Sequence, residues 1–376
     1  MTELTTTLNR HAIRWQLLST ASAMALLAST YVAGKAEAAD AGSDRPTVWI
    51  ELGGDLDHVG GQGDNFPVGF VTANPNSSVL HPVSPFQAQN STPFSFGEHG
   101  GISFQPQASD WVFSASIRYG RSSNFKHVDH QTNRAHVTPY AITTIEDFAD
   151  TKVRRRESHA ILDFSAGKDL GLGLFGREGS SVASLGVRFV QFASAETLDA
   201  RARPDFGYKY STILPGIPLP HFHTYHVTGK ATRSFHGVGP TLSWTGSAPF
   251  LDNPQDGNVA LDWGANASVL FGRQRARVAH QESGRYENVK YRAEGGSHGY
   301  PLIYQHSGGH SSDRSVIVPN VGGFAGISLR RGAAKVSFGY RGDFFFGAMD
   351  GGIDKRKSEN VGFYGPFATI GVGIGE

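Results

Sequence analysis

The sequence predicts an all-β fold, a transmembrane up-and-down antiparallel β-barrel of about ten strands, within a range of about eight to twelve. Three observations lead to this fold class: side chains that alternate apolar and polar, connections that alternate long and short, and a composition with 47 glycines and 11% aromatic residues. The alternation is clearest in residues 335–346, KVSFGYRGDFFF, where Val336 and Phe338 share one face and Lys335 and Arg341 share the other. A period of two residues means an extended strand whose successive side chains point to opposite faces of a sheet.

Ten segments carry this alternation, and we expect each of them to form one strand. Their apolar faces carry residues such as Ile50, Phe113, Leu162, Val187 and Val269, while the opposite faces carry charged or small residues. After residue 38 no segment sustains the spacing of an amphipathic helix. In chain order the expected strands are 48–57, 100–105, 111–120, 158–167, 182–193, 225–244, 259–271, 315–329, 335–346 and 362–374.

The connections between these segments favour a barrel over a β-sandwich. An up-and-down barrel places long loops at one end and short turns at the other, whereas Greek-key sandwiches follow no such rule. Several apolar faces also end in aromatic residues, as at Trp111 and Tyr119, which is typical of the girdles at membrane interfaces. The alternative left open is a secreted β-sandwich binding module. The long loops that we expect are 57–95, 121–154, 204–220, 283–312 and 347–358, and the short turns are 106–110, 169–181, 246–257 and 331–333.

Residues 1–38 have the layout of a cleaved secretory signal peptide. A basic leader precedes an uncharged stretch at residues 15–34, and a small-x-small site follows at 36–38. An uncleaved membrane anchor is the alternative, but serines and threonines dilute the stretch. We therefore expect residues 39–376 to form the mature barrel, exported to the outer membrane of a Gram-negative bacterium.

The charge balance argues against one class of partner. The chain carries 34 Lys and Arg residues and 33 Asp and Glu residues, a formal net charge of +1. Proteins that bind nucleic acid present a basic excess, so we expect no nucleic-acid partner.

Four segments of the chain resemble a known family. VWIELGGDLDHVGG (48–61), SDWVFSASIRYGRS (109–122), KVSFGYRGDFFFGAMDGG (335–352) and ENVGFYGPFATIGVGIG (359–375) are similar to the pore-forming outer-membrane proteins typified by the Legionella major outer membrane protein. The similarity is strongest near the C-terminus and in the first mature strand. The resemblance implies a β-barrel porin that conducts small solutes.

The chain departs from that family in two respects. Proteins of that kind can carry cysteines for disulfides between subunits, and this chain has none, which excludes covalent oligomers and leaves a non-covalent homo-oligomer open. Barrels of the outer membrane also commonly end in an aromatic residue that the barrel-assembly machinery recognises, whereas this sequence ends Ile374-Gly375-Glu376.

Three apparent motifs lead to no catalytic, cofactor or metal prediction. GLGLFG at 171–176 matches a dinucleotide-binding pattern, but turn residues and a strand follow it where a helix is needed. His221, His223 and His226 share the spacing of metal ligands, yet no cysteine or well-placed carboxylate completes the set, so we expect solvated histidines at a loop rim. No nucleophile elbow is present. We expect no enzyme activity, no cofactor and no metal site.

The candidate site is therefore the face of the strands opposite the lipid. Inward charges set ion selectivity and hold water in a porin, and mixed signs predict weak selectivity. Arg154, Arg155 and Arg156 re-enter a strand from an expected outer loop, where one or two of them are candidates for lining the pore mouth; the alternative is a basic collar that contacts lipopolysaccharide. The candidate pore-lining residues are Glu51, Asp55, Arg118, Asp163, Arg188, Asp262, Lys335, Arg341 and Asp343.

The sequence thus favours a porin-like channel for passive diffusion of small hydrophilic solutes. Outer-membrane lipid, lipopolysaccharide and the barrel-assembly machinery are the other expected partners. The rival hypothesis is a narrow, closed barrel that serves as a structural or adhesive surface protein, because barrels of about eight strands are filled by side chains and those of about sixteen leave a channel.

Overall fold

The computed structural model describes residues 47–60, 94–106, 109–138, 141–170, 180–203, 221–253, 257–289 and 299–374. Ten strands make up this part of the chain, and the predicted all-β class is confirmed. The strands are β1 (Thr47–Gly60), β2 (Phe94–Gln105), β3 (Trp111–Thr138), β4 (Ala141–Asp169), β5 (Ser180–Arg203), β6 (His221–Asn253), β7 (Gly257–Val289), β8 (Gly299–Arg331), β9 (Ala334–Asp350) and β10 (Ser358–Ile374). The expected signal peptide lies outside the described residues.

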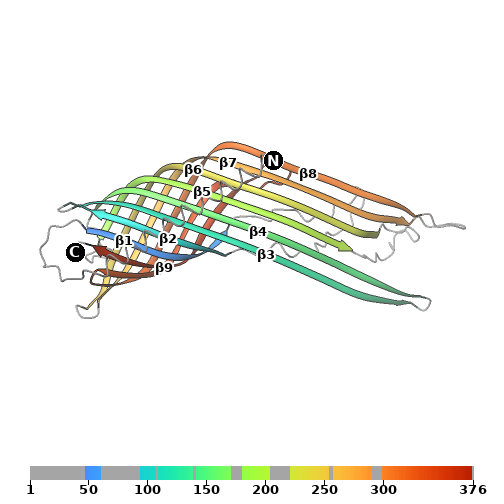
Figure 1. The fold of residues 1–376 in the computed structure, drawn as a ribbon, viewed down its shortest axis with the longest axis horizontal. Helices are drawn as coiled ribbons and strands as arrows, with labels where there is room; N and C mark the ends of the chain where they lie inside the picture. Colours follow the sequence, from blue (N-terminus) through green and yellow to red (C-terminus); the bar gives the residue numbers. More distant parts are fainter. Residues whose placement is uncertain are drawn as a thin grey trace, which may run out of the picture. The chain divides into compact units, whose positions relative to one another are not determined.

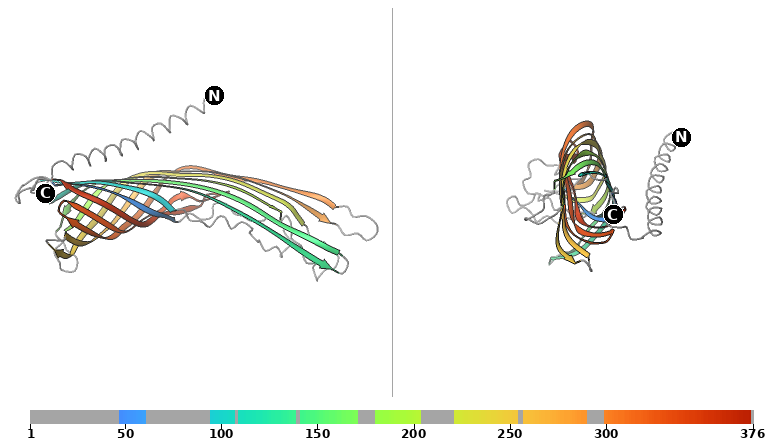
Figure 2. Two further views of the ribbon diagram at one scale, coloured as in Figure 1. Left: turned by 60° about the horizontal axis from the view of Figure 1, so that its bottom comes forward. Right: turned by 90° about the vertical axis from the view of Figure 1, so that its left-hand side faces the viewer.

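The strands form a closed antiparallel barrel in which every strand pairs with its neighbours in the sequence. The ring closes where β1 pairs with β10, with Val48 opposite Ile374 and Gly60 opposite Gly362. Figures 1 and 2 show the tilted strands of this barrel. Closure leaves no unpaired edge in the ring, which is what a sheet in lipid requires.

The β8–β9 connection shows how a short turn sets the register. Gly332 and Ala333 alone connect the two strands, and Arg331 pairs with Ala334. Gly332 has a φ of 56°, a left-handed conformation that glycine adopts without steric cost. This tight turn fixes β9 against β8 and therefore sets which of its residues point inward.

Six strands are much longer than the barrel needs. β3 to β8 have 24 to 33 residues, whereas β1, β2, β9 and β10 have 12 to 17. In Figure 1 the long strands continue past the short ones as a curved sheet. We call this sheet the extended wall and assign to it residues 121–138, 141–158, 193–203, 221–236, 273–289 and 299–315.

The extended wall corrects the predicted loops. Residues 121–154 and 283–312 were expected to be long loops, but most of them belong to strand pairs with unbroken register from Trp111↔Lys168 to Thr138↔Ala141 and from Asn258↔Arg330 to Val289↔Gly299. The predicted turn at 246–257 is likewise mostly strand. The alternation that marked strands was that of a sheet with an apolar outward face, and it fades where the outward side chains become polar.

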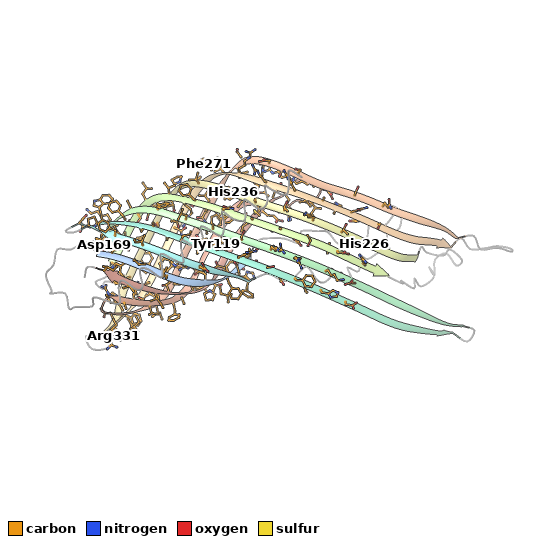
Figure 3. The ribbon with its side chains drawn as sticks, in the orientation of Figure 1. Tyr119, Asp169, His226, His236, Phe271 and Arg331 are labelled. Atoms are coloured by element: carbon orange, nitrogen blue, oxygen red, sulfur yellow. The ribbon has the colours of Figure 1, made fainter. Side chains whose placement is uncertain are left out.

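The outward side chains form an apolar band around the barrel. Large hydrophobic residues on all ten strands are exposed: Ile117 is 51% exposed, Phe338 62% and Ile370 60%. Trp111 and Trp244 lie near the end with short turns, and Tyr119 and Phe271 near the other end. Figure 3 shows Asp169 and Arg331 at the end with short turns, and Phe271 and His236 where the strands enter the extended wall. A contiguous apolar band of this extent marks a surface made for a non-aqueous neighbour.

Among the described residues, no helix has the length and apolarity to cross a bilayer.

Candidate functional site

The structure places every candidate pore-lining residue on the inner face of the barrel. Asp55, Arg118, Arg188 and Asp343 are buried there, and Glu51, Asp163 and Arg341 occupy the same phase of their strands. Lys335 lies nearest the short turns, where its Nζ is 2.6 Å from Oδ2 of Asp262. That these residues line a conducting pore stays a prediction.

Arg188 of β5 is the centre of a charged layer that crosses the lumen. Its Nε and Nη2 donate to the two carboxylate oxygens of Asp163, on neighbouring β4, at 2.6 and 2.8 Å. Its Nη1 lies 2.7 Å from Oδ1 of Asn266, 2.5 Å from Oδ1 of Asn320 and 3.2 Å from Oδ1 of Asp343. Because β6, β7 and β8 separate β5 from β9, the contact with Asp343 spans the interior.

Asp343 joins this arginine to a second one from the other side of the ring. Arg118 of β3 donates through Nη2 to Oδ2 of Asp343, and β2, β1 and β10 lie between their two strands. Arg118, Arg188 and Asp343 are 8%, 4% and 3% exposed, so bulk water does not occupy the space between them. We call Arg118, Asp163, Arg188, Asn266, Asn320 and Asp343 the ionic layer.

Arg341 lies one inward position closer to the short turns than Asp343. Its Nε is 3.4 Å from Oδ1 of Asp55, and its guanidinium lies 4.2 Å from the ring centroid of Phe367. Both contacts hold the side chain against β1 and β10, so Arg341 adds charge to the region beside the ionic layer.

An aromatic layer fills the lumen on the other side of the ionic layer. Phe192 of β5 and Phe363 of β10 have ring centroids 5.0 Å apart, although their strands lie on opposite sides of the ring, with four strands between them either way. Phe345, next inward after Asp343 on β9, lies 4.6 Å from Phe192. His159 packs 4.0 Å from Phe363, and Phe235 lies 5.9 Å from Phe192. All five side chains are at most 3% exposed.

A loop lies over the inner face beyond the aromatic layer. Residues 351–357, which we call the cap loop, connect β9 to β10 and begin after the buried Asp350. Arg233 of β6 donates from Nε to the Asp350 carbonyl oxygen at 2.6 Å, and Nε2 of His280 of β7 lies 2.6 Å from Oδ1 of Asp354. The cap loop is therefore held against the inner face of the long strands.

The carboxylate of Asp350 fixes the start of the cap loop. Oδ2 accepts from Ser312 at 2.7 Å and lies 2.9 Å from Nε2 of His310, and Oδ1 accepts from the backbone N–H groups of Gly352 and Lys357. Burial raises the pKa of Asp350, but these hydrogen bonds outweigh it and lower the pKa to about 2. Since the pKa is depressed, the stabilisation is complete above the pKa of a free aspartate, about 4, and is lost as the pH falls through about 2.

Asp350→Asn should therefore release the cap loop at neutral pH. We expect a loss of about 1.5–3 kcal/mol of local stability, because hydrogen bonds to a charged group are removed. Trypsin should then cleave faster after Lys355, an exposed residue of the loop, as followed by mass spectrometry of the folded protein. Asp313→Asn, which removes an exposed carboxylate on the outer face, is the matched control and should leave the cleavage rate unchanged. Equal rates for Asp350→Asn and wild type would contradict this role.

The three consecutive arginines divide between the two faces of β4. Arg154 and Arg156 are exposed on the outer surface of the extended wall, where Arg154 lies 5.7 Å from the Phe125 ring centroid. Arg155 points inward, and its Nε is 2.7 Å from Oε1 of Glu157. Of the three candidates for a pore mouth, only Arg155 has its side chain on the lumenal side.

Sequence reasoning missed the aromatic layer and the amides of the ionic layer. The signal available was the inward phase of Phe192, Phe345 and Phe363, which lie among polar residues where a water-filled lumen would have none. The partners of Arg188 were not predictable, because they depend on how far the strands are staggered around the ring.

The described part of the chain holds no cluster of three or more His, Cys, Asp or Glu side chains that could bind a metal ion. His226 interacts with Asp199, with Nε2 3.1 Å from Oδ1. His221 and His223 lie at positions whose side chains are outside the described part.

Comparisons with known proteins do not assign a family. No family model matches the chain, and no curated protein matches it. Among solved structures, the chain is similar to the TodX deltaS2S3 mutant monoaromatic hydrocarbon channel, with 9% identity over 88% of this chain and 90% of that chain and a TM-score of 0.19. The barrel assignment rests on the strand pairing and not on this likeness.

Proposed function

We propose that this protein is an outer-membrane channel for small hydrophilic solutes whose lumen is closed at rest by the ionic and aromatic layers. The observation that supports it best is a charged network, centred on Arg188 and Asp343, that crosses the inside of a closed barrel. The apolar band outside and the polar lining inside are the two surfaces that such a channel needs.

The two layers differ in what they do to water. Rings packed across a lumen form a hydrophobic constriction, which closes a pore by excluding water. Charged and amide groups attract water once it has access to them, so the ionic layer becomes passable when the aromatic layer separates. The resting protein is therefore a much poorer conductor than an open porin of similar size.

The buried charges favour a channel over a purely structural barrel. Burying ion pairs costs desolvation energy, and well-packed apolar residues of similar volume usually stabilise as well or better. A barrel selected only to be rigid gains nothing from Arg118, Asp163 and Arg188 inside it. A channel uses such groups to hold water and solutes in the conducting state.

Single-channel recording tests the proposal. The folded full chain, reconstituted into a planar bilayer, should give rare, brief openings of low conductance at neutral pH. A permanently open, large conductance would contradict closure at rest. Silence of both the wild type and a variant with an opened aromatic layer would contradict the channel itself.

The proposed membrane location predicts the effect of a charge on the band. Phe338→Arg places a guanidinium at a position that is 62% exposed on the outer face. We expect a destabilisation of about 2–4 kcal/mol in lipid and poor insertion into vesicles, because a basic side chain must face hydrocarbon. Insertion is measured by the heat-modifiable gel shift of the folded barrel.

Phe338→Leu is the control for that substitution, since it shortens the side chain without adding charge. It should insert as the wild type does. Equal insertion of Phe338→Arg and Phe338→Leu would show that this face does not contact lipid.

A second candidate function is that of a surface barrel with a structural or adhesive role. The extended wall favours it, because six strands continue well beyond the apolar band. Under this hypothesis opening the aromatic layer creates a leak that the wild type never shows, and wild-type recordings stay silent.

A further inference from the structure

The outer surface of the extended wall is strongly basic directly beyond the apolar band. Arg273, Arg275 and Arg277 occupy successive outward positions of β7, and the side chains of Arg273 and Arg275 are 60% and 57% exposed. Strand register brings Thr232 opposite Arg277 and Ser234 opposite Arg275. We define the basic patch by its exposed basic residues, which are Arg121, Arg154, Arg156, Lys230, Arg273, Arg275 and Arg277.

Little negative charge balances this patch. Among the described residues beside it on the outer face, the acidic side chains are Asp313 of β8 and Asp199 of β5, which lies one outward position beyond the level of Arg154 and Lys230 and interacts with Arg201 and His226. Asp313 is paired with two of the arginines, at 2.5 Å from Nε of Arg273 and 3.1 Å from Nε of Arg275. Hydrogen bonding from Arg273 is the main cause that lowers the pKa of Asp313. This carboxylate is therefore ionised at neutral pH. The seven basic side chains of the patch outnumber these two acidic groups, which leaves the patch with a positive excess.

The patch meets the apolar band at a surface pocket between β7 and β8. The pocket is lined by Phe271, Gly272, Arg273, Ser315, Val316 and Ile317. Phe271 and Ile317 lie on the side of the pocket nearer the short turns; they are 55% and 64% exposed and belong to the apolar band. Figure 3 shows Phe271 and His236 where the strands leave the barrel. The pocket thus has the apolar side chains of Phe271 and Ile317 on one side and the guanidinium of Arg273 on the other. This arrangement matches a ligand with an acyl chain and an anionic headgroup.

We infer that the basic patch binds the phosphate groups of lipopolysaccharide in the outer leaflet, with its acyl chains against Phe271 and Ile317. This inference rests on the membrane location proposed above and not on conduction. Arginine and lysine side chains pair with phosphate oxygens through charge-assisted hydrogen bonds, and the hydroxyls of Thr232, Ser234 and Ser315 lie on the same face. A phosphorylated glycolipid presents several such groups at the level of the patch, whereas a phospholipid presents one phosphodiester.

The test measures binding of lipid A to the folded full chain in mixed detergent micelles. The informative variant is Lys230→Gln/Arg277→Gln, which removes two exposed charges for which the structure gives no ion pair in its described part. We expect its affinity to fall about fivefold for each lost charge and about twenty-five-fold for both. Lys168→Gln/Arg331→Gln removes the same charge from exposed positions at the end with short turns, and its affinity should stay at the wild-type value.

A gain-of-binding variant guards against misfolding as the cause. Asp313→Asn frees Arg273 and Arg275 from their shared carboxylate and should tighten lipid A binding about fivefold. Each variant is first checked for the heat-modifiable gel shift, which shows that it has folded. Its single-channel behaviour should match that of the wild type. A failure of this inference is therefore distinguishable from a failure of the channel proposal.

Three results would overturn the inference. The first is an equal loss of affinity in the two charge-removing pairs. The second is binding of phosphatidylglycerol as tight as that of lipid A, which would make the patch a general anionic-lipid surface. The third is displacement of lipid A by inorganic phosphate at matched phosphate concentration, which would mean that the patch recognises free anions.

Discussion

An Asp343→Asn protein is expected to lose about 3–5 kcal/mol of its free energy of unfolding, since removing one partner leaves buried charge uncompensated. Asp343 is the carboxylate shared by Arg118 and Arg188, which are 8% and 4% exposed. Arg188 keeps its bidentate pair with Asp163, so the main cost arises at Arg118. Urea unfolding of the protein in lipid vesicles, followed by tryptophan fluorescence, measures the change.

Two further variants show whether burial causes this loss. Asp110→Asn removes a carboxylate from the pair with Lys168, whose two side chains are 70% and 53% exposed, and should cost about 0–1 kcal/mol. Arg118→Met in the Asp343→Asn background removes the buried arginine charge that has lost its carboxylate partner. It should restore a large part of the free energy of unfolding. If Asp343→Asn and Asp110→Asn are equally mild, the ionic layer is hydrated and the lumen is open at that level.

The second large effect is expected from opening the aromatic layer. Phe192→Ala/Phe363→Ala removes two rings that meet across the barrel at 5.0 Å. Each substitution should cost about 3–5 kcal/mol through lost burial and the cavity left behind. The space admits water, so recordings in a planar bilayer should change from rare openings to a sustained conductance.

Phe164→Ala/Phe189→Ala is the matched control for this pair. These two rings also contact each other, at 6.3 Å between centroids, but they lie on the outer face and are 48% and 44% exposed. The control should leave conductance at the wild-type level. A sustained current in both double variants would mean that general loosening of the barrel, and not the aromatic layer, controls conduction.

The predictable part of the candidate site is the part that strand alternation determines. The inward phase of Arg118, Arg188 and Asp343 follows from sequence parity alone, and the structure places all three inside. The same alternation places Arg155 on the inner face and Arg154 and Arg156 on the outer face. We had expected the three arginines where an outer loop re-enters a strand.

The contacts across the lumen were not predictable from one sequence. They depend on the stagger between strands, which decides whether Phe192 meets Phe363 or passes it. The lengths of β3 to β8 were also underestimated, because a strand whose outward side chains are polar has the composition of a loop. The rule of apolar and polar alternation describes only the part of a strand that carries the apolar band.

The pairing of β1 with β10 also bears on the order of folding. It joins residues from near the start of the barrel sequence to its end, and such distant contacts are slow to form because the entropy of closing a long loop must be lost first. Arg118 and Asp343 are 225 residues apart, and their strands are brought close through β1 and β10. We expect hairpins such as β8–β9 to form early and the ring to close last. The charges inside the barrel then meet only after closure, so their pairing chiefly slows reopening of the ring and contributes to kinetic stability.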